Sequence, residues 1–441
     1  MATNQLEFRE ELYIEHLEEA SFLYEKRLNW LEDDEVGWQE LEEIDLAIDA
    51  HLDALIVGDQ LALQTCLKQI PNADFGVLHT IVRIICRYRL VHQLTNMWGK
   101  IDLEDEDKIK AIADALKWEV SKEMLPYLIS VFENQQTELY PVVTPALARC
   151  DELAQQRLAA SLINAQTKDK LTLLENIYSC KHNLTNENYY HLHHYLQDSD
   201  KRIVHQTALI LIAFNDNTLN ECRSRIRQLP YLFALAGNEQ DSQMLLNVAQ
   251  NGEADADILI ALGLTGIFTT VFTLIKYLEH PELSDKAALA LNLITGANLY
   301  VTEHKADDVK EDELFESELD AFKNNELPKN INGLPFGVAV KKLSTNVEEW
   351  ESWLKANQNK FFPEGCYRNG HFFSASELLN NLINNQMPTK LRQLAYNELI
   401  LRYQLTIPFY VDDPIYQQQI TINKIYQWIE KNKAQNPDGF W

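Results

Sequence analysis

Apolar residues recur along this chain with the spacing of amphipathic helices, and the pattern repeats between Pro230 and Gly296. Three apolar stretches, Tyr231–Ala236, Ile258–Leu264 and Leu289–Ile294, each run into a glycine. These glycines are Gly237, Gly266 and Gly296, at spacings of 29 and 30 residues. A period of this length fits one helix–turn–helix unit with its connection, and it is typical of an α-solenoid, in which neighbouring units bury each other's apolar faces.

Helical periodicity also predicts helices on both sides of this repeat. Two amphipathic helices joined around Asp33–Trp38 are expected at the N-terminus, followed by a pair over Leu61–Met97 that breaks at Pro71-Asn72. Further helices are expected at Lys108–Trp118, Lys122–Glu133, Pro141–Cys150, Leu153–Ala165, Lys168–Tyr178, Asn186–Leu196, Ile203–Phe214, Thr218–Gln228, Val347–Asn357, Ser376–Asn385, Pro388–Gln404 and Tyr416–Lys433.

The fold class predicted from this succession is all-α, a HEAT-like α-solenoid of stacked helix pairs. Regularity stops over residues 300–336, where acidic residues are followed by Pro328, Gly333 and Pro335, which indicates an insertion or a linker. We therefore expect four segments. They are an acidic N-terminal helical cap at 1–60, HEAT-like repeats at 61–299, an acidic insertion at 300–345 and a C-terminal helical region at 346–441.

The composition narrows the function. The chain has 441 residues and a formal net charge of −27, from 66 Asp and Glu against 39 Lys and Arg. Nucleic-acid affinity depends mainly on neutralising phosphates with basic groups, so DNA and RNA are poor candidate partners. The same balance disfavours an anionic membrane surface and favours basic segments of other proteins.

The remaining signals predict a cytoplasmic protein. The six cysteines show no C-x-x-C spacing and are typical of reduced thiols in a reducing compartment. No basic and apolar leader opens the sequence, and no apolar run approaches the length of a membrane span.

Acidic residues form a stripe on the second predicted helix. Asp45, Asp49 and Asp53 fall at positions i, i+4 and i+8, hence on one helix face. A hydrolase would need one carboxylate raised in pKa by burial and held near its partner, which an exposed stripe does not provide. A solvated face, or a docking face for Lys and Arg, is the interpretation that we prefer.

A histidine cluster raises the question of a metal. His191 and His194 share a helix face, with His193 beside them, and could chelate one ion. No acidic residue completes an H-E-x-x-H pattern and no cysteine stands at ligand spacing, so we expect neither a metal nor another cofactor.

The aromatic loop over Phe361–Phe373 is the main alternative site. Tyr367, Arg368 and His371 lie within it and could line an enzyme pocket, although such loops more often anchor onto a solenoid layer. Phosphate-binding glycine motifs and the G-x-S-x-G nucleophile motif are absent from the sequence, so an enzyme is not the expected class.

The N-terminal residues resemble a known family. The run Ile14–Arg27 ends in a Phe-Leu-x-x-x-Arg pattern, and Asp45–Leu55 carries the pattern Asp-x-x-Ile-x-Ala-His-Leu-Asp-x-Leu. Both resemble an uncharacterised bacterial family of HEAT-repeat-like proteins associated with type VI secretion gene clusters, as do Leu289–Leu299 and the stretch from Tyr367 to Tyr403.

This resemblance implies a non-enzymatic adaptor or chaperone that binds an effector or spike component with basic segments. The residues we expect at the partner surface are Arg27, Asp45, Asp49, His51, Asp53, Tyr367 and Arg368. A structural alternative stays open, in which Arg27 pairs with an acid on the second helix and His51 hydrogen-bonds inside the helical pair. A lyase or hydrolase, or a self-assembling structural protein, would be the alternative classes.

Overall fold

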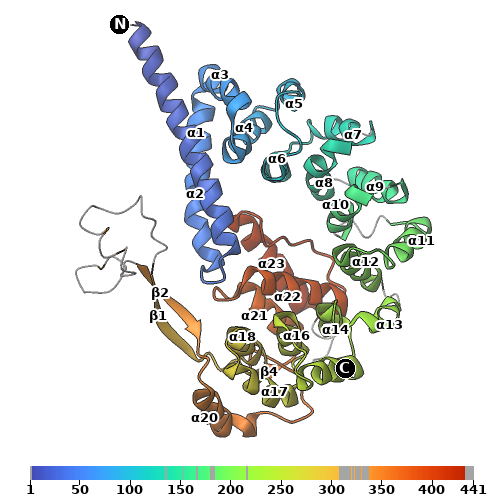
Figure 1. The fold of residues 1–441 in the computed structure, drawn as a ribbon. Coiled ribbons are helices and arrows are strands. Elements are labelled where there is room, and N and C mark those ends of the chain that lie inside the picture. Colours follow the sequence, from blue (N-terminus) through green and yellow to red (C-terminus); the bar gives the residue numbers. More distant parts are fainter. Residues whose placement is uncertain are drawn as a thin grey trace. The chain divides into compact units, whose positions relative to one another are not determined.

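The structure is a computed structural model that describes residues 2–134, 137–150, 152–164, 167–178, 184–214, 217–306 and 337–432, together with Leu319, Phe322 and Lys329. It is mostly helical, as the periodicity predicts (Figure 1). Contacts divide the chain into two compact units, and each is described by itself. Unit 1 holds the described residues up to Asp241 and from Leu378 onward, and unit 2 holds those of Ser242–Glu377. The C-terminal helices thus group with the N-terminal half, a division that differs from the four consecutive segments expected.

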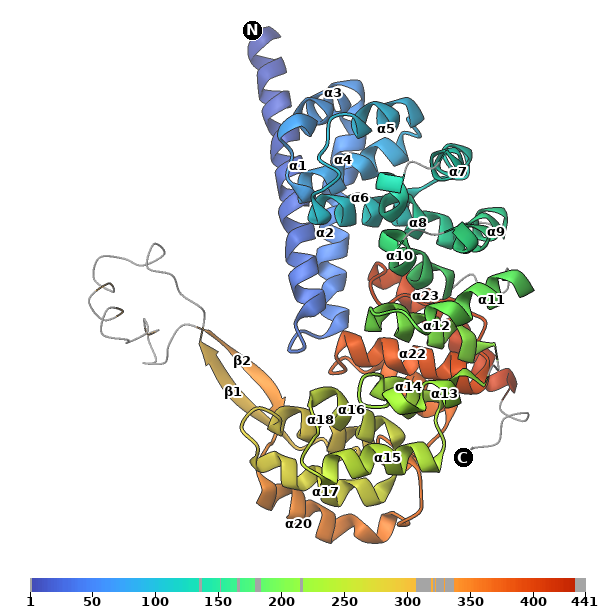
Figure 2. The same cartoon turned by 45° about the vertical axis from the view of Figure 1, so that its right-hand side comes forward.

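Unit 1 begins with a helical hairpin of α1 (Ala2–Glu32) and α2 (Leu41–Val57). Its other helices up to residue 241 are α3 (Asp59–Gln69), α4 (Phe75–Arg87), α5 (Val91–Trp98), α6 (Glu106–Glu119), α7 (Leu125–Glu133), α8 (Tyr140–Arg149), α9 (Glu152–Ser161), α10 (Thr167–Ile177), α11 (Asn186–Tyr195), α12 (Lys201–Ala213), α13 (Thr218–Glu221) and α14 (Pro230–Ala236). The helices α4, α6, α8, α10, α12 and α14 contact one another in that order, and α1 packs on α4 (Figures 1 and 2).

Local sequence explains how the helices of this row begin and end. Asp74 caps α4 by accepting a hydrogen bond from the Val77 N–H at 2.7 Å, and Asp105 and Asp200 cap α6 and α12 in the same way. The expected second helix of the Leu61–Met97 pair is interrupted, because Arg89 takes a left-handed conformation with φ 57° between α4 and α5. That break falls in an unbroken apolar pattern, and nothing in the periodicity announces it.

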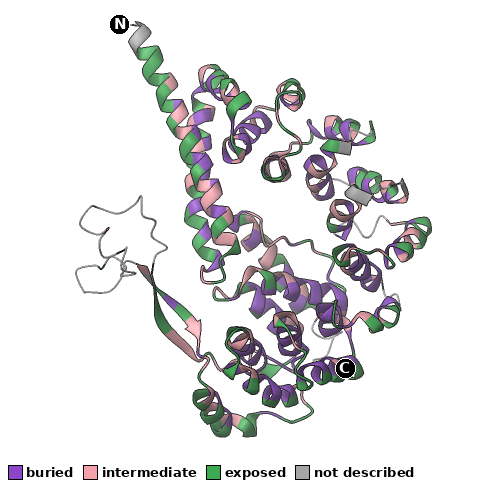
Figure 3. Ribbon diagram, in the orientation of Figure 1, coloured by how far each residue is buried: buried purple, intermediate pink, exposed green. Residues whose placement is uncertain are grey.

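The C-terminal part of unit 1 contains most of α21 (Ala375–Ile383), α22 (Thr389–Tyr403) and α23 (Ile415–Asn432). Helix α22 packs against α12 and α14, while α23 contacts α2. Residues 394–401 are all buried, and Figure 3 shows α22 as one of the most buried helices of this unit. A helix that is covered around most of its circumference forms part of the core and does more than cap one end.

Unit 2 explains the repeating glycines. Its elements are most of α15 (Glu239–Gln250), α16 (Ala256–Thr265), α17 (Val271–Lys276), α18 (Ser284–Thr295), β1 (Tyr300–Ala306), β2 (Gly337–Leu343), α20 (Val347–Asn357), β3 (Tyr367–Arg368), β4 (His371–Phe372) and the first residues of α21 (Ala375–Ile383). Gly266 and Gly296 end α16 and α18 in the left-handed conformation, whereas Gly237 has φ −73° and does not. Gly237 therefore also caps the end of a helix, α14, but without the left-handed conformation.

The short hairpin β3–β4 is hydrogen-bonded to the helix ends at which these left-handed glycines lie. The Tyr367 N–H donates to the Gly266 carbonyl at 2.8 Å, and the Asn369 N–H donates to the Leu293 carbonyl at 2.8 Å. A methyl group on Gly296 would lie 2.2 Å from the Asn369 carbonyl oxygen. The aromatic loop therefore anchors on the helix ends, as the preferred interpretation of that loop predicts.

The acidic insertion contains a strand pair that the sequence pattern does not predict. Strands β1 and β2 pair antiparallel, from Tyr300 opposite Leu343 to Ala306 opposite Gly337. Most of the residues between them lie outside the described part of the chain, so the expectation of an insertion or linker there stays a prediction.

Replacing Gly296 by alanine should lower the free energy of unfolding by about 1–3 kcal/mol, because the side chain adds left-handed strain and meets the Asn369 backbone. Gly252→Ala is the matched control, because Gly252 has φ 74° and nothing within 4 Å of the added carbon. Urea unfolding of both variants measures the difference. Equal losses would mean that the hairpin yields to the added methyl group at no cost.

Candidate ligand-binding cavity

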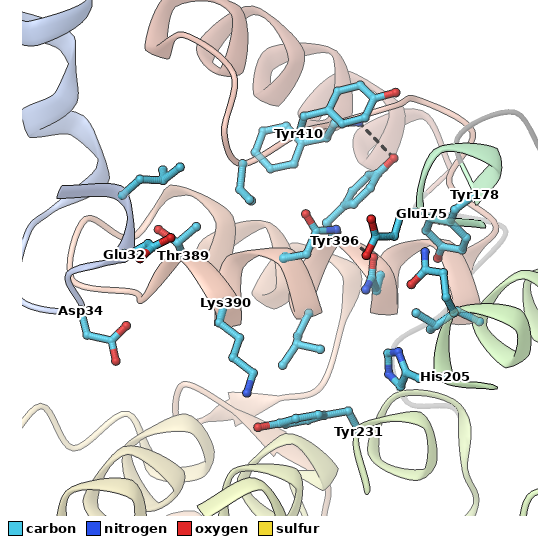
Figure 4. Close-up of a pocket in the computed structure, with 18 residues that line it drawn as sticks. Glu32, Asp34, Glu175, Tyr178, His205, Tyr231, Thr389, Lys390, Tyr396 and Tyr410 are labelled. Carbon is cyan, nitrogen blue, oxygen red and sulfur yellow. Dashed lines mark hydrogen bonds between the residues drawn. The ribbon is translucent and has the colours of Figure 1, made fainter. Parts of the chain in front are cut away.

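A cavity of about 710 Å³ lies inside unit 1. Its walls come from the end of α1, from α10, α12, α14 and α22, and from the segment that follows α22 (Figure 4). Five aromatic side chains line it: Tyr178, Tyr231, Tyr396, Phe409 and Tyr410. This volume lies within the range of small-molecule and cofactor sites, which are concave and mostly apolar with a few polar groups.

Tyr178 carries the most unusual polar group of the cavity. It follows α10, its residue is 8% exposed, and its hydroxyl has no hydrogen-bond partner among the described residues. Its ring reaches from α10 toward the other labelled residues (Figure 4). Burial raises the pKa of this phenol well above 10, so the group stays protonated and can still donate or accept a hydrogen bond.

Carboxylates surround the aromatic walls. Glu32 and Asp34 come from the end of α1 and the turn after it, and Glu175 comes from α10, three residues before Tyr178. The Glu175 side chain reaches solvent, yet the surrounding protein displaces enough water to raise the pKa of its carboxyl, an effect that Arg202 partly offsets. Glu32 and Glu175 form no ion pair with any described residue. The carboxylates thus outnumber the one ammonium of the lining, Lys390, by three to one.

Internal contacts hold the other wall groups in place. The Tyr396 hydroxyl donates to the Ile407 carbonyl at 3.1 Å and accepts from the Phe409 N–H at 3.0 Å. The Lys390 ammonium lies 4.7 Å from the centroid of the Tyr231 ring, at cation–π distance. The cavity walls are therefore preorganised, which lowers the entropic cost of binding.

A charge network fixes the segment that closes the cavity. The Arg149 guanidinium lies 3.6 Å from the centroid of the Tyr410 ring and pairs with Asp413. Lys117 pairs with Asp412 at 2.5 Å and with Asp114 at 2.6 Å. Asp114 also accepts from the Tyr24 hydroxyl at 2.8 Å. Basic side chains of α6 and α8 thereby hold the acidic loop between α22 and α23 onto the N-terminal helices.

Arg27 and His51, which were expected at a partner surface, form contacts inside the N-terminal hairpin instead. Arg27 is 1% exposed and pairs with Asp45 of α2 at 2.5 Å, which is the pairing with the second helix that the sequence left open. The ring nitrogens of His51 and His16 lie 3.0 Å apart within the same hairpin. Burial, followed by the charge on His16, lowers the pKa of His51.

The rest of the acidic stripe does meet arginines, but they belong to this chain. Asp49 pairs with Arg83 at 2.8 Å and with Arg87 at 2.7 Å, and Asp53 pairs with Arg87 at 2.8 Å. The side chain of Asp53 remains 75% exposed, while that of Asp49 is 34% exposed. Contact of this stripe with a partner stays a prediction, and its exposed end at Asp53 is where we expect it.

Tyr367 and Arg368 form hydrogen bonds within unit 2. Tyr367 is 1% exposed and its hydroxyl accepts from the Phe362 N–H at 2.7 Å. Arg368 is fully buried and donates to the Leu264 carbonyl at 2.6 Å. His371 is exposed and lies 3.1 Å from Glu377. Neither Tyr367 nor Arg368 presents a polar atom to a partner or substrate in this conformation.

The histidine cluster shows no metal geometry. In the described part of the chain, no group of three or more His, Cys, Asp or Glu side chains is placed to hold an ion. His193 lies 3.9 Å from Glu221, and the His194 ring packs edge-on against Tyr190.

The cavity was not predicted from the sequence. Its residues come from six separate stretches between Leu31 and Val411, and of its five aromatic residues only Tyr231 and Tyr396 lie within α-helices. The one local signal is Glu175, a carboxylate three residues before an aromatic residue and hence on the same side of α10.

Replacing Tyr178 by phenylalanine should raise the free energy of unfolding by about 1 kcal/mol, since an unpartnered buried hydroxyl costs about 1–3 kcal/mol. Tyr396→Phe is the contrasting variant, because it removes a hydroxyl with two hydrogen bonds and should destabilise the protein. Chemical denaturation compares the two. A loss of stability in Tyr178→Phe would show that this hydroxyl is satisfied in solution.

Comparison with known proteins adds no relative: no protein-family model, no curated protein and no solved structure matches this chain. Among the described residues, no helix is both long and apolar enough to cross a membrane.

Proposed function

We propose that this chain is a non-enzymatic protein-binding scaffold, an adaptor or chaperone built as a HEAT-like solenoid in the cytoplasm. The observation that carries the proposal is the cavity of unit 1, with its aromatic walls and its excess of carboxylates in a chain of net charge −27. Such a surface suits a partner that presents basic groups together with apolar ones. The ordered contacts from α4 to α14 support the solenoid, because consecutive helices of that row contact each other.

The partner class follows from the N-terminal resemblance. We propose an effector or spike component of type VI secretion, which the scaffold binds through a basic segment before loading. Acidic groups around the cavity would attract that segment, and the aromatic walls would cover its apolar side chains.

Affinity purification of the tagged full chain from the cells that express it, followed by mass spectrometry, tests this proposal. We expect a secretion component to co-purify at low salt and to be lost at high salt, since screening weakens attraction between exposed charges. A Glu32→Gln, Glu175→Gln double variant should recover less of it, and Glu7→Gln, which is exposed on α1, should recover as much as the wild type. Recovery of housekeeping enzymes alone would refute the proposal.

A further inference from the structure

The cavity of unit 1 combines three features that together define a ligand class. Aromatic side chains line it, and carboxylates outnumber its single ammonium. In addition, the hydroxyl of Tyr178, a residue that is 8% exposed, has no hydrogen-bond partner among the described residues. Aromatic faces attract cations through their quadrupole, and carboxylates attract them through charge. A neutral apolar ligand would leave the Tyr178 hydroxyl without a partner.

We propose that this cavity binds one organic cation on an apolar stem, namely a lysine or arginine side chain in a segment of the partner protein. The aliphatic stem lies against the aromatic walls. The terminal ammonium or guanidinium donates to the Glu175 carboxylate and to the Tyr178 hydroxyl oxygen. This inference rests on the proposed scaffold function and specifies which group of the partner the cavity takes.

The size of the cavity separates a peptide side chain from a free amine. About 710 Å³ exceeds the volume of one lysine side chain and leaves room for flanking residues. A lysine or arginine side chain with its flanking backbone therefore fills this space better than a diamine of similar stem length.

Calorimetric titration of the full chain tests the inference with three probes. They are acetyl-Ala-Lys-Ala-amide, the norleucine analogue with the same apolar stem and no charge, and cadaverine as the free diamine. We expect the lysine peptide to bind at least tenfold more tightly than either other probe. Equal binding of the norleucine peptide, or no detectable binding of the lysine peptide, overturns the proposal. Tighter binding of cadaverine overturns the assignment to a peptide.

Two variants locate the binding site. Glu175→Gln should weaken binding of the lysine peptide about tenfold, while Glu7→Gln leaves it unchanged. Tyr178→Phe should also weaken binding, although its melting temperature does not fall, a combination that general damage to the fold cannot produce. Unchanged affinity in both cavity variants overturns the inference.

The outcomes of these experiments distinguish failure of the cavity assignment from failure of the proposed function. If a secretion component co-purifies equally with the wild type and with Glu175→Gln, the scaffold stands and the cavity assignment fails. If the lysine peptide binds in the cavity but no secretion component is recovered, the cavity assignment stands and the proposed function fails.

Discussion

Arg27→Met should lower the free energy of unfolding by about 3–5 kcal/mol, the range for removing one member of a buried ion pair. The loss arises mainly from Asp45, whose side chain is 9% exposed and would lose the guanidinium that pairs with it. Arg27 also donates to the Asp413 carbonyl at 3.0 Å and lies 4.9 Å from the centroid of the Trp118 ring. The variant therefore weakens contacts of α1 with α2, with α6 and with the loop before α23.

Urea unfolding monitored by circular dichroism measures this effect. Arg9→Met is the matched control, because Arg9 is an exposed arginine of the same helix and its loss should cost no more than about 0.5 kcal/mol. A double variant, Arg27→Met with Asp45→Leu, should regain much of the lost stability, since both charges are then absent from the core. If the Arg27→Met protein is as stable as the Arg9→Met protein, the buried pair does not contribute to the free energy of unfolding.

Helices were predictable here where apolar spacing and capping residues agree. Val347–Asn357 is a helix with the predicted bounds, and Asn346 caps it through its side chain. The break at Arg89 was not predictable, because its left-handed backbone closes the end of α4, where the Leu90 N–H donates to the Ile85 carbonyl at 3.0 Å, with no glycine or proline to mark it. The pairing of β1 with β2 joins strands more than 30 residues apart, which local periodicity does not detect.

The side-chain contacts likewise divide into those that the sequence could predict and those that it could not. The Arg27–Asp45 pair joins two helices of one hairpin, 18 residues apart, and pairing of Arg27 with an acid of the second helix was one of the alternatives that the sequence left open. The partners of Asp49 lie on α4, and those of Lys117 include Asp412, 295 residues away. The pairs of Asp49 follow from how α2 packs on α4, and the pair of Lys117 with Asp412 follows from how the segment between α22 and α23 packs on the N-terminal helices. The cavity also depends on how α22 packs against α12 and α14, and the sequence does not show that these distant residues meet.

Lys117→Met should also lower the free energy of unfolding at pH 7 by about 3–5 kcal/mol, and this loss should depend on pH. Lys117 has a side chain 7% exposed and neutralises Asp114 and Asp412 together. Burial would lower its pKa, but these two carboxylates outweigh burial and raise it above 10.5. Burial likewise would raise the pKa of Asp412, but Lys117 and Arg149 outweigh it and hold that pKa below 3.8.

The direction of the pH effect follows from these shifts. A carboxyl with a lowered folded-state pKa stabilises the protein above its unfolded value and loses that contribution as the pH falls below about 3.8. A lysine with a raised pKa stabilises the protein below 10.5 and loses that contribution at higher pH. The difference between the wild type and Lys117→Met should therefore be largest between these limits and narrow on both sides.

Unfolding midpoints in urea from pH 3 to pH 11 measure this difference, with Lys110→Met as the control on the exposed side of the same helix. Asp413 works against the acid limb, because burial raises its pKa and its protonation relieves a cost that is present at neutral pH. The wild-type curve alone therefore mixes both aspartates, whereas the difference between the two proteins isolates what Lys117 contributes. A difference that stays constant across this range would mean that Lys117 stabilises the loop through packing of its alkyl chain alone.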